Sequence, residues 1–239
     1  MIRTICVYLY LLVSVIFVSV IGFPANIIFS FFLKKVKSRI NYRIGQIWSI
    51  LLIKITGCKM TVTGRENIPS EGGLCLVCNH GSIFDIAVLL ANTGRSLAFI
   101  AKKELMYVPL INIWISLIGG LYIDRKNFRK GLKTINKGVD RIKNGSVMVV
   151  FPEGHRSRGQ GLLPFRSGAL KLATQAQAPI VPIAITGTYE VFEKNYRVCP
   201  GPVSVTICKP IPTAGLPKEE RKQILNEQVY QIISDALKA

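Results

Sequence analysis

A histidine and an aspartate, His80 and Asp85, stand five positions apart where strand-like residues give way to helix-like ones. The apolar run 73–77 before them is typical of a buried strand, and the run 86–90 after them is typical of a helix. Residues five apart on one helix lie about 140° apart around its axis, so the two side chains can meet only if His80 precedes the helix. Asp85 would then lie in the first turn. Such a pair has the parts of a general base and its orienting group.

Two partners compete for Asp85 at such a helix start. With Ser82 as N-cap, the carboxylate can reach back to the unpaired backbone N–H groups of the first turn. It can instead accept the imidazole N–H, which fixes the tautomer and leaves the other ring nitrogen as the base. A helix N-terminus also favours the neutral imidazole that a base requires. The structural alternative is that Asp85 only caps the helix and His80 is an ordinary loop histidine.

Other charged residues follow predicted strands, where the sites of α/β sheets lie. Lys102 follows the run 96–101 and Arg125 follows the run 121–123. Arginine binds phosphate through a planar fork of donors, although Arg125 can also be an ordinary surface residue. The loop after the run 146–151 contains Glu153, Gly154, His155, Arg156 and Arg158. Charge so concentrated after a buried strand favours a binding loop over a solvated one, and glycine lets the backbone approach a ligand.

The chain is both basic and apolar. Its 239 residues include 31 Lys and Arg against 13 Asp and Glu, a net charge of +18, and 49% are hydrophobic. The mean hydropathy is +0.36. Chains this basic bind polyanions such as nucleic acids, anionic lipids or acidic proteins. Because nucleic-acid-binding proteins are seldom so apolar, the combination favours a membrane surface.

The six cysteines lack the spacing of a small disulfide framework, and most lie in apolar runs. This indicates buried thiols in a reducing compartment. Cys75, Cys78 and His80 form a C-x2-C-x-H string that suggests zinc. On a strand, however, residues 75 and 78 point to opposite faces and cannot share one ion. We therefore expect no metal site.

The first 56 residues have the character of a membrane anchor. Residues 4–33 carry no charge, a proline interrupts them within 22–26, and a basic cluster follows at 34–43. A second apolar run occupies 47–55. We expect either one span or two helices lying in one leaflet, with the basic cluster on the cytoplasmic side.

Beyond residue 57, strand-like and helix-like runs alternate. The predicted strands are 60–63, 73–77, 96–101, 121–123, 146–151, 180–185 and, as an edge strand, 202–208; the predicted helices are 86–90, 108–117, 129–142, 168–176 and 218–237. This alternation predicts an α/β domain over residues 57–239, with a mixed, mostly parallel sheet flanked by helices.

Four motifs in this region resemble, in order and spacing, those of the glycerolipid acyltransferases, in particular the 1-acylglycerol-3-phosphate acyltransferases. They are Asn79-His80 with Asp85, Gly119-Gly120 with Ile123-Asp124-Arg125, Phe151-Pro152-Glu153-Gly154-His155-Arg156-Ser157, and Val181-Pro182-Ile183. Together they cover about residues 56–210, and the N-terminal apolar segment resembles the anchor of the bacterial enzymes. One departure is His155, where the family more often has threonine.

The resemblance implies a reaction as well as a fold. His80 would deprotonate the sn-2 hydroxyl of lysophosphatidic acid as it attacks an acyl thioester, and Asp85 would orient His80. The phosphate site would consist of Arg125, Glu153, Gly154, Arg156, Lys102 and Arg158. The product would be phosphatidic acid, formed without an acyl-enzyme and without a cofactor beyond the donor, which is acyl carrier protein or coenzyme A. The enzyme would be membrane-associated with its active site on the cytoplasmic side, at the inner membrane in a bacterium.

Other assignments remain open from the residues. The acceptor can be glycerol-3-phosphate or another lysophospholipid, and His155 can replace His80 as the base. A non-catalytic protein that docks on anionic membranes also accounts for the composition. A nucleic-acid-binding protein is disfavoured because the aromatic residues are not interleaved with the basic clusters.

Overall fold

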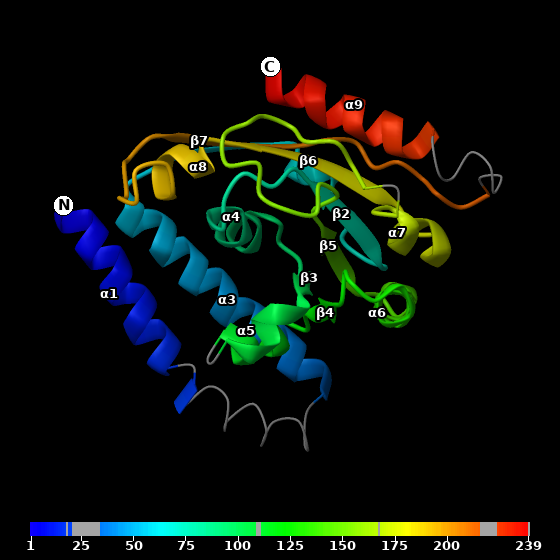
Figure 1. The fold of residues 1–239 in the computed structure, drawn as a ribbon, viewed down its shortest axis with the longest axis horizontal. Helices are drawn as coiled ribbons and strands as arrows, with labels where there is room; N and C mark the ends of the chain where they lie inside the picture. The colour runs from blue at the N-terminus through cyan, green and yellow to red at the C-terminus, as the bar shows by residue number, and fades with distance from the viewer. Residues whose placement is uncertain (18, 21–33, 109–110, 167, 216–223, 239) are drawn as a thin grey trace.

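The computed structural model describes residues 1–17, 19–20, 34–108, 111–166, 168–215 and 224–238 (Figure 1). Within these ranges, the side chains of residues 34–38 and 224 are outside the description. The predicted interruption at 22–26 therefore lies outside the described residues, and so do the side chains of Lys34, Lys35 and Lys37 in the predicted basic cluster.

One sheet of seven strands organises the described part of the chain, in the order β1-β7-β6-β2-β5-β3-β4. The strands are β1 (Lys59–Thr63), β2 (Leu74–Cys78), β3 (Leu97–Lys102), β4 (Leu121–Ile123), β5 (Val147–Val150), β6 (Ile180–Thr186) and β7 (Pro202–Ile207). Neighbouring strands are parallel except β6 and β7, which confirms a mixed, mostly parallel sheet. The prediction that 202–208 is an edge strand was wrong, because β1 pairs with the outer side of β7.

The central strands are buried on both faces, as expected for a parallel sheet covered by helices. Every residue of β2 and β5 is buried. Alternate side chains enter different apolar clusters: Cys75 and Val77 lie in one, and Leu76 and Cys78 in the other. The expected placement of the two cysteines on opposite faces is therefore confirmed.

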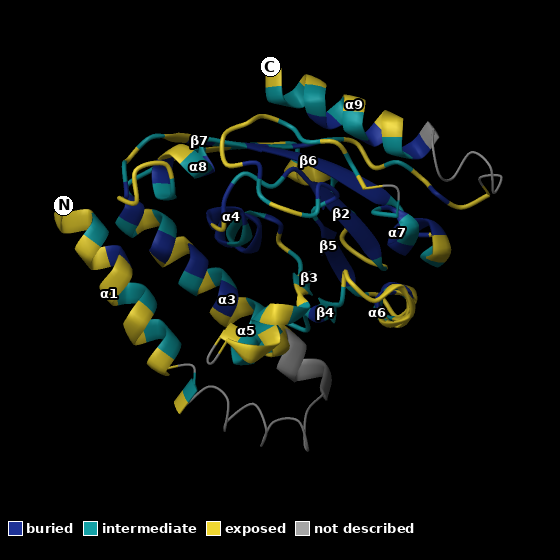
Figure 2. Cartoon of the chain, viewed as in Figure 1, coloured by how far each residue is buried: buried dark blue, intermediate teal, exposed yellow. Residues whose placement is uncertain are grey.

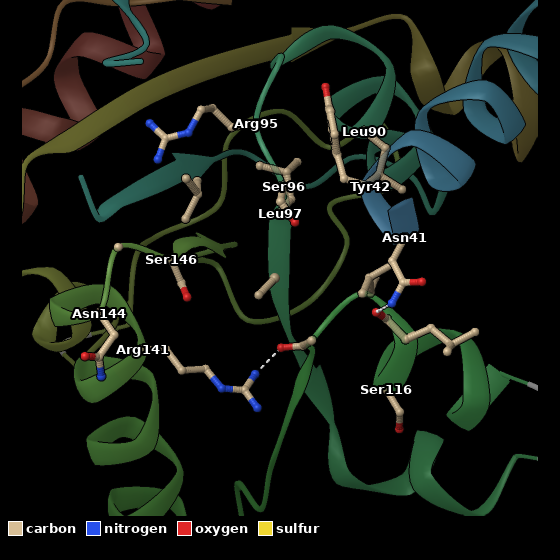
Figure 3. A pocket seen from close by; sticks show the side chains of 16 residues that line it. Asn41, Tyr42, Leu90, Arg95, Ser96, Leu97, Ser116, Arg141, Asn144 and Ser146 are labelled. Atoms are coloured by element: carbon tan, nitrogen blue, oxygen red, sulfur yellow. Dashed lines mark hydrogen bonds between the residues drawn. The ribbon is translucent and has the colours of Figure 1, made fainter. Parts of the chain in front are cut away.

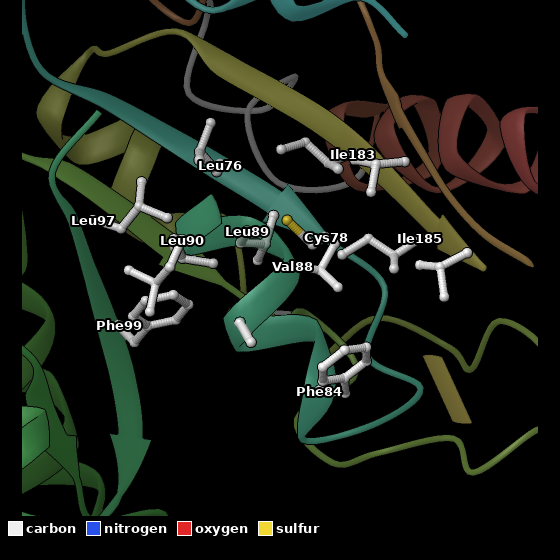
Figure 4. Close-up of a cluster of buried hydrophobic side chains, with 14 of the residues drawn as sticks. Leu76, Cys78, Phe84, Val88, Leu89, Leu90, Leu97, Phe99, Ile183 and Ile185 are labelled. Carbon is white, nitrogen blue, oxygen red and sulfur yellow. The ribbon is translucent and has the colours of Figure 1, made fainter. Parts of the chain in front are cut away.

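Helices cover both faces of the sheet (Figure 1). The helices are α1 (Ile2–Phe17), α3 (Lys34–Thr56), α4 (Phe84–Asn92), α5 (Ile111–Leu117), α6 (Phe128–Lys143), α7 (Lys171–Ala176), α8 (Thr188–Phe192) and α9 (Ile224–Lys238), with the short 3-10 helices η2 (Arg65–Asn67) and η3 (Lys103–Tyr107). Residues of α6, α7 and α9 join the cluster that contains Cys75. Residues of α4, with one each from α3 and α1, join the cluster that contains Cys78 (Figure 4).

The two N-terminal helices, α1 and α3, pack on the face of the sheet whose cluster contains Cys78. The Tyr10 hydroxyl of α1 donates to the Trp48 carbonyl of α3 over 2.9 Å. Along α1 only Val7 is buried, and most of its other apolar side chains are exposed (Figure 2). Among the helices of the described residues, none combines the length and the apolar content needed to cross a bilayer.

The predicted strands all occur, each with ends within two residues of the prediction. The predicted helices occur with larger differences at their ends: the run 108–117 becomes α5 only from Ile111, and 168–176 becomes α7 only from Lys171. The sequence did not predict α8, which follows β6 directly after a glycine.

Candidate active site

Topology gathers the predicted site residues at one end of the sheet. The strands β2, β3, β4, β5 and β6 run in the same direction, so their carboxyl-terminal ends meet there. His80 lies two residues after β2, Arg125 two residues after β4, and Glu153 three residues after β5. This is the end at which open α/β sheets carry their ligands.

His80 and Asp85 are in direct contact. His80 Nδ1 lies 2.9 Å from Asp85 Oδ2, and the Asp85 side chain is fully buried. The same oxygen accepts the backbone N–H groups of Gly81 at 2.9 Å and Ser82 at 3.0 Å. Oδ1 accepts the Thr188 hydroxyl at 2.6 Å. Asp85 therefore fills both expected roles at once, as partner of the imidazole and as acceptor for unpaired backbone donors. Donors on both oxygens offset the cost of burying the carboxylate.

Helix α4 begins as the spacing required, with His80 before it and Asp85 in its first turn. Its N-cap is Ile83 rather than the predicted Ser82, and no side chain caps it. The Ser82 hydroxyl instead accepts the Phe84 N–H at 3.1 Å and donates to Glu193 at 2.9 Å. The Ile83 N–H also donates to Glu193, at 2.7 Å. A carboxylate from the end of α8 thus holds the start of α4.

The backbone around His80 is held from two sides. The preceding residue, Asn79, exchanges two hydrogen bonds with the Ile185 backbone of β6, at 2.9 and 2.8 Å. The His80 N–H donates to Glu153 at 2.6 Å, and the His80 carbonyl accepts the Ser157 N–H at 2.7 Å. The loop that follows β5 therefore fixes the position of the histidine main chain.

The imidazole ring also has a fixed plane. It stacks on Phe151, with ring centroids 4.0 Å apart and planes 16° apart. The His80 side chain is 16% exposed. Because Nδ1 faces Asp85, the opposite nitrogen, Nε2, is the one placed to take a proton from a bound substrate.

Glu153 is almost fully buried and faces the protein interior. Its second carboxylate oxygen accepts the Leu163 N–H at 3.0 Å. Burial raises the pKa of Glu153 to about 7, the bonds from His80 and Leu163 oppose this rise, and the charge of Asp85 adds to it. A direct role of Glu153 toward phosphate stays a prediction, since both of its oxygens are turned to backbone N–H groups.

The predicted cations do not all point to one place. Arg125 is exposed, and its guanidinium donates to the carbonyl of Gly154, which links the β4 end to the loop after β5. Arg156 instead pairs with Glu193 at 2.8 Å, and Lys102 pairs with Glu104 at 3.6 Å. Arg158 and His155 are exposed on the same loop.

Arg166, to which the sequence assigned no role, lies next to this link. Its Nε lies 3.4 Å from the Glu153 carbonyl, within hydrogen-bonding distance. A Cβ on Gly154 would come within 2.3 Å of that Nε and displace the Arg166 side chain, and the φ of +79° would strain any residue other than glycine. Burial lowers the pKa of Arg125, and the nearby charge of Arg166 lowers it further, while Glu104 raises it. Two guanidiniums thus lie close together beside the loop, an arrangement suited to a doubly charged anion.

Thr188 and Glu193 were missed by sequence reasoning. Both lie in or just after α8, more than 100 residues along the chain from Asp85 and Ser82, the groups they contact at the start of α4. The one sequence signal was the position of Thr188, because the segment Thr186-Gly187-Thr188 follows the predicted strand 180–185, as the other site residues follow theirs.

A cavity of about 450 Å³ lies elsewhere (Figure 3). Its lining includes Leu97 and Val147, the first residues of β3 and β5, together with Arg95 and Arg141. It is therefore at the amino-terminal end of the sheet, away from His80, and is not the catalytic site. The described residues contain no cluster of three metal-binding side chains.

Comparison with known proteins identifies the family. The acyltransferase family model matches residues 59–186. The 1-acyl-sn-glycerol-3-phosphate acyltransferase of Cocos nucifera is 34% identical over 196 residues, which are 81% of this chain and 62% of that protein. The protein of the same name from Saccharomyces cerevisiae is 35% identical over 186 residues, which are 76% of this chain and 61% of that protein. This chain thus covers less than two thirds of either relative's length.

A solved structure agrees with the sequence matches. The crystal structure of the 1-acyl-sn-glycerophosphate (LPA) acyltransferase PlsC from Thermotoga maritima has a TM-score of 0.82 and 25% sequence identity to this chain. The match covers 99% of this chain and 95% of that one. The chain described here belongs to the acyltransferase family.

Proposed function

We propose that this chain transfers an acyl group from acyl carrier protein or coenzyme A to the sn-2 hydroxyl of lysophosphatidic acid, making phosphatidic acid. The similar proteins from coconut, yeast and Thermotoga carry this activity in their names. The observation that carries the proposal is the 2.9 Å contact between His80 Nδ1 and Asp85 Oδ2 at the carboxyl-terminal end of the sheet.

The proposed chemistry is direct transfer with His80 as general base. Nε2 removes the proton of the acceptor hydroxyl while its oxygen attacks the thioester carbonyl carbon. The carbon–sulfur bond then breaks, and the leaving thiolate takes the proton back from the imidazolium, giving a free thiol. Asp85 stabilises the transient imidazolium through Nδ1–H. A thioester is already activated, so an acyl-enzyme is unnecessary once the reactants are aligned.

The proposed phosphate site includes Arg125, Glu153, Gly154, Arg156, Lys102 and Arg158. Support is strongest for Arg125, which donates to the Gly154 carbonyl at the carboxyl-terminal end of the sheet and lies beside Arg166. Arg156 supports the site through Glu193, and Glu153 through the His80 backbone. Lys102 and Arg158 would add charge at the surface, where salt screens them most.

We also propose two regions, an N-terminal membrane-anchoring pair of helices over residues 1–56 and a catalytic domain over 57–239. The exposed apolar side chains of α1 support the first, because they would be covered by acyl chains in a bilayer. The charge of +18 favours the anionic cytoplasmic leaflet, the anionic lysolipid and an acidic acyl donor.

The test is an acyl-transfer assay with the purified chain. Acyl-loaded acyl carrier protein and acyl-CoA, each with a radiolabelled acyl chain, are offered in turn with lysophosphatidate, glycerol-3-phosphate or a lysophospholipid with a larger head group. We expect label in phosphatidic acid with lysophosphatidate and at least one donor. Preferential transfer to another acceptor would change the proposed substrate. Vesicle binding without thioester consumption under any combination would contradict an enzymatic role.

A further inference from the structure

Exposed apolar side chains of the catalytic domain gather at its catalytic end. Among the described residues of 57–239, the large apolar side chains that are exposed are Ile83, Met106, Tyr107, Val108, Ile111, Phe128, Leu132 and Tyr196. All but Tyr196 belong to segments that directly follow β2, β3 or β4. These strands run in the same direction, so the segments emerge at the end of the sheet that holds His80.

The two aromatic side chains of this group are largely exposed. Tyr107 is 73% exposed and Phe128 is 76% exposed. Aromatic side chains bury more apolar area than most other residues, and their clustering on one surface marks an interaction site. The neighbouring α5 is anchored from its other side, because Trp114 packs against Trp48 of α3 with centroids 4.9 Å apart. Figure 2 shows exposed residues on α1, at the left of the view, and on α5, below the sheet.

Positive charge surrounds this apolar group. The exposed cations nearby are Lys102, Arg125, Lys126, Arg129, Lys130 and Lys133. The two carboxylates between residues 102 and 133 are already paired, Glu104 with Lys102 at 3.6 Å and Asp124 with Lys103 at 3.0 Å. The surface therefore combines exposed aromatic and aliphatic side chains with an excess of cations, the composition of proteins that lie in a bilayer interface.

We propose that this surface, named here the catalytic rim (Ile83, Met106, Tyr107, Val108, Ile111, Phe128 and Leu132), is a second contact with an anionic bilayer, separate from α1. The inference rests on the proposed function, because it gives the acceptor lysolipid a route to His80 along the membrane plane. An acidic carrier protein would use the cations but would leave the apolar side chains without a partner. For this reason lipid is the occupant that the rim fits.

Contact can be measured directly with the full chain. In the variant Phe128→Trp, the added indole should shift its emission to shorter wavelength on vesicles containing phosphatidylglycerol, and brominated acyl chains should quench it. The matched control is Gln228→Trp, an exposed position on α9, outside the segments that follow β2, β3 and β4. Subtraction of the parent spectrum removes the signal of Trp48 and Trp114. Equal quenching differences for the two variants, or a shift at Phe128→Trp caused only by acidic carrier protein, would overturn the proposal.

The effect of membrane contact on activity can be separated from the acyl-transfer reaction itself. The double variant Tyr107→Ser, Phe128→Ser should lose about tenfold in kcat/KM with lysophosphatidate presented in vesicles, because apolar burial at the interface is lost. With a short-chain lysophosphatidate dissolved as monomers, it should stay within about twofold of the parent chain. Equal losses of kcat/KM with vesicle-bound and monomeric lysophosphatidate would contradict the proposed membrane contact of the catalytic rim. Quenching at Phe128→Trp in a chain with no acyl transfer would instead refute the proposed function and leave the rim standing.

Discussion

The hydroxyl of Thr188 donates to Asp85 Oδ1 over 2.6 Å, although 103 residues of chain separate them. Both side chains are buried, and the other oxygen of Asp85 faces His80. The orientation of His80 thus depends on the Asp85 carboxylate, which Thr188, after β6, hydrogen-bonds on the oxygen that does not face His80. This arrangement makes Thr188 a positioning residue for the pair.

Thr188→Val keeps the shape of the side chain and removes its donor. We expect kcat to fall about tenfold, with the KM for lysophosphatidate little changed, because an unpaired carboxylate oxygen lets Asp85 rotate away from His80. The free energy of unfolding should fall by about 1–3 kcal/mol. Thr188→Ser retains the hydroxyl and should retain most of kcat. Equal kcat for Thr188→Val and the parent chain would remove Thr188 from the catalytic arrangement.

Glu153 makes stability depend on pH in an unusual direction for a carboxylate. Its pKa is raised from 4.5 to about 7 in the folded chain, chiefly by burial. A raised folded pKa contributes stability that is complete below pH 4.5 and lost as pH rises through 7. At about 1.4 kcal/mol per pKa unit, the contribution of this group is about 3 kcal/mol at most.

Urea unfolding of Glu153→Gln tests this titration. Between about pH 5 and about pH 8, the parent chain should lose more stability than the variant, which has no group to titrate at that site. Glu190→Gln, at an exposed position on α8, should follow the parent. Parallel pH profiles for parent and Glu153→Gln would show that burial does not raise this pKa.

Arg125 gives a test of the phosphate site. Its loss in Arg125→Ala should raise the KM for lysophosphatidate about 10–100-fold, the value of one charge-assisted contact, with the donor KM nearly unchanged. Arg65→Ala is the control, because it removes the same charge outside the proposed phosphate site. Arg65 donates to Asn92, and its loss should change neither KM by much. Equal increases in both KM values for Arg125→Ala would exclude it as a ligand of the lysolipid phosphate.

Local patterns predicted the strands well because buried parallel strands form short apolar runs bounded by turns, as in Leu74–Cys78 and Val147–Val150. Strand pairing is nonlocal, so the sequence could not show that β1 covers the outer side of β7. The placement of His80 and Asp85 followed from helix geometry alone. The roles of Thr188 and Glu193 could not be predicted, because their contacts with the start of α4 form only when distant segments fold together. Arg166 contacts the Glu153 carbonyl 13 residues earlier, and no local pattern signals a contact across an irregular loop.

The chain has two histidines, His80 and His155. Of these two, His80 is the one that contacts Asp85 in the structure. The central claim is therefore tested by acyl transfer to lysophosphatidate by His80→Ala and His155→Ala, each first shown to unfold cooperatively like the parent. We expect His80→Ala to lose at least about 100-fold in kcat, the contribution of a general base, and His155→Ala to stay within about threefold. Near-parental turnover by His80→Ala, or loss of activity in His155→Ala alone, would contradict His80 as the base.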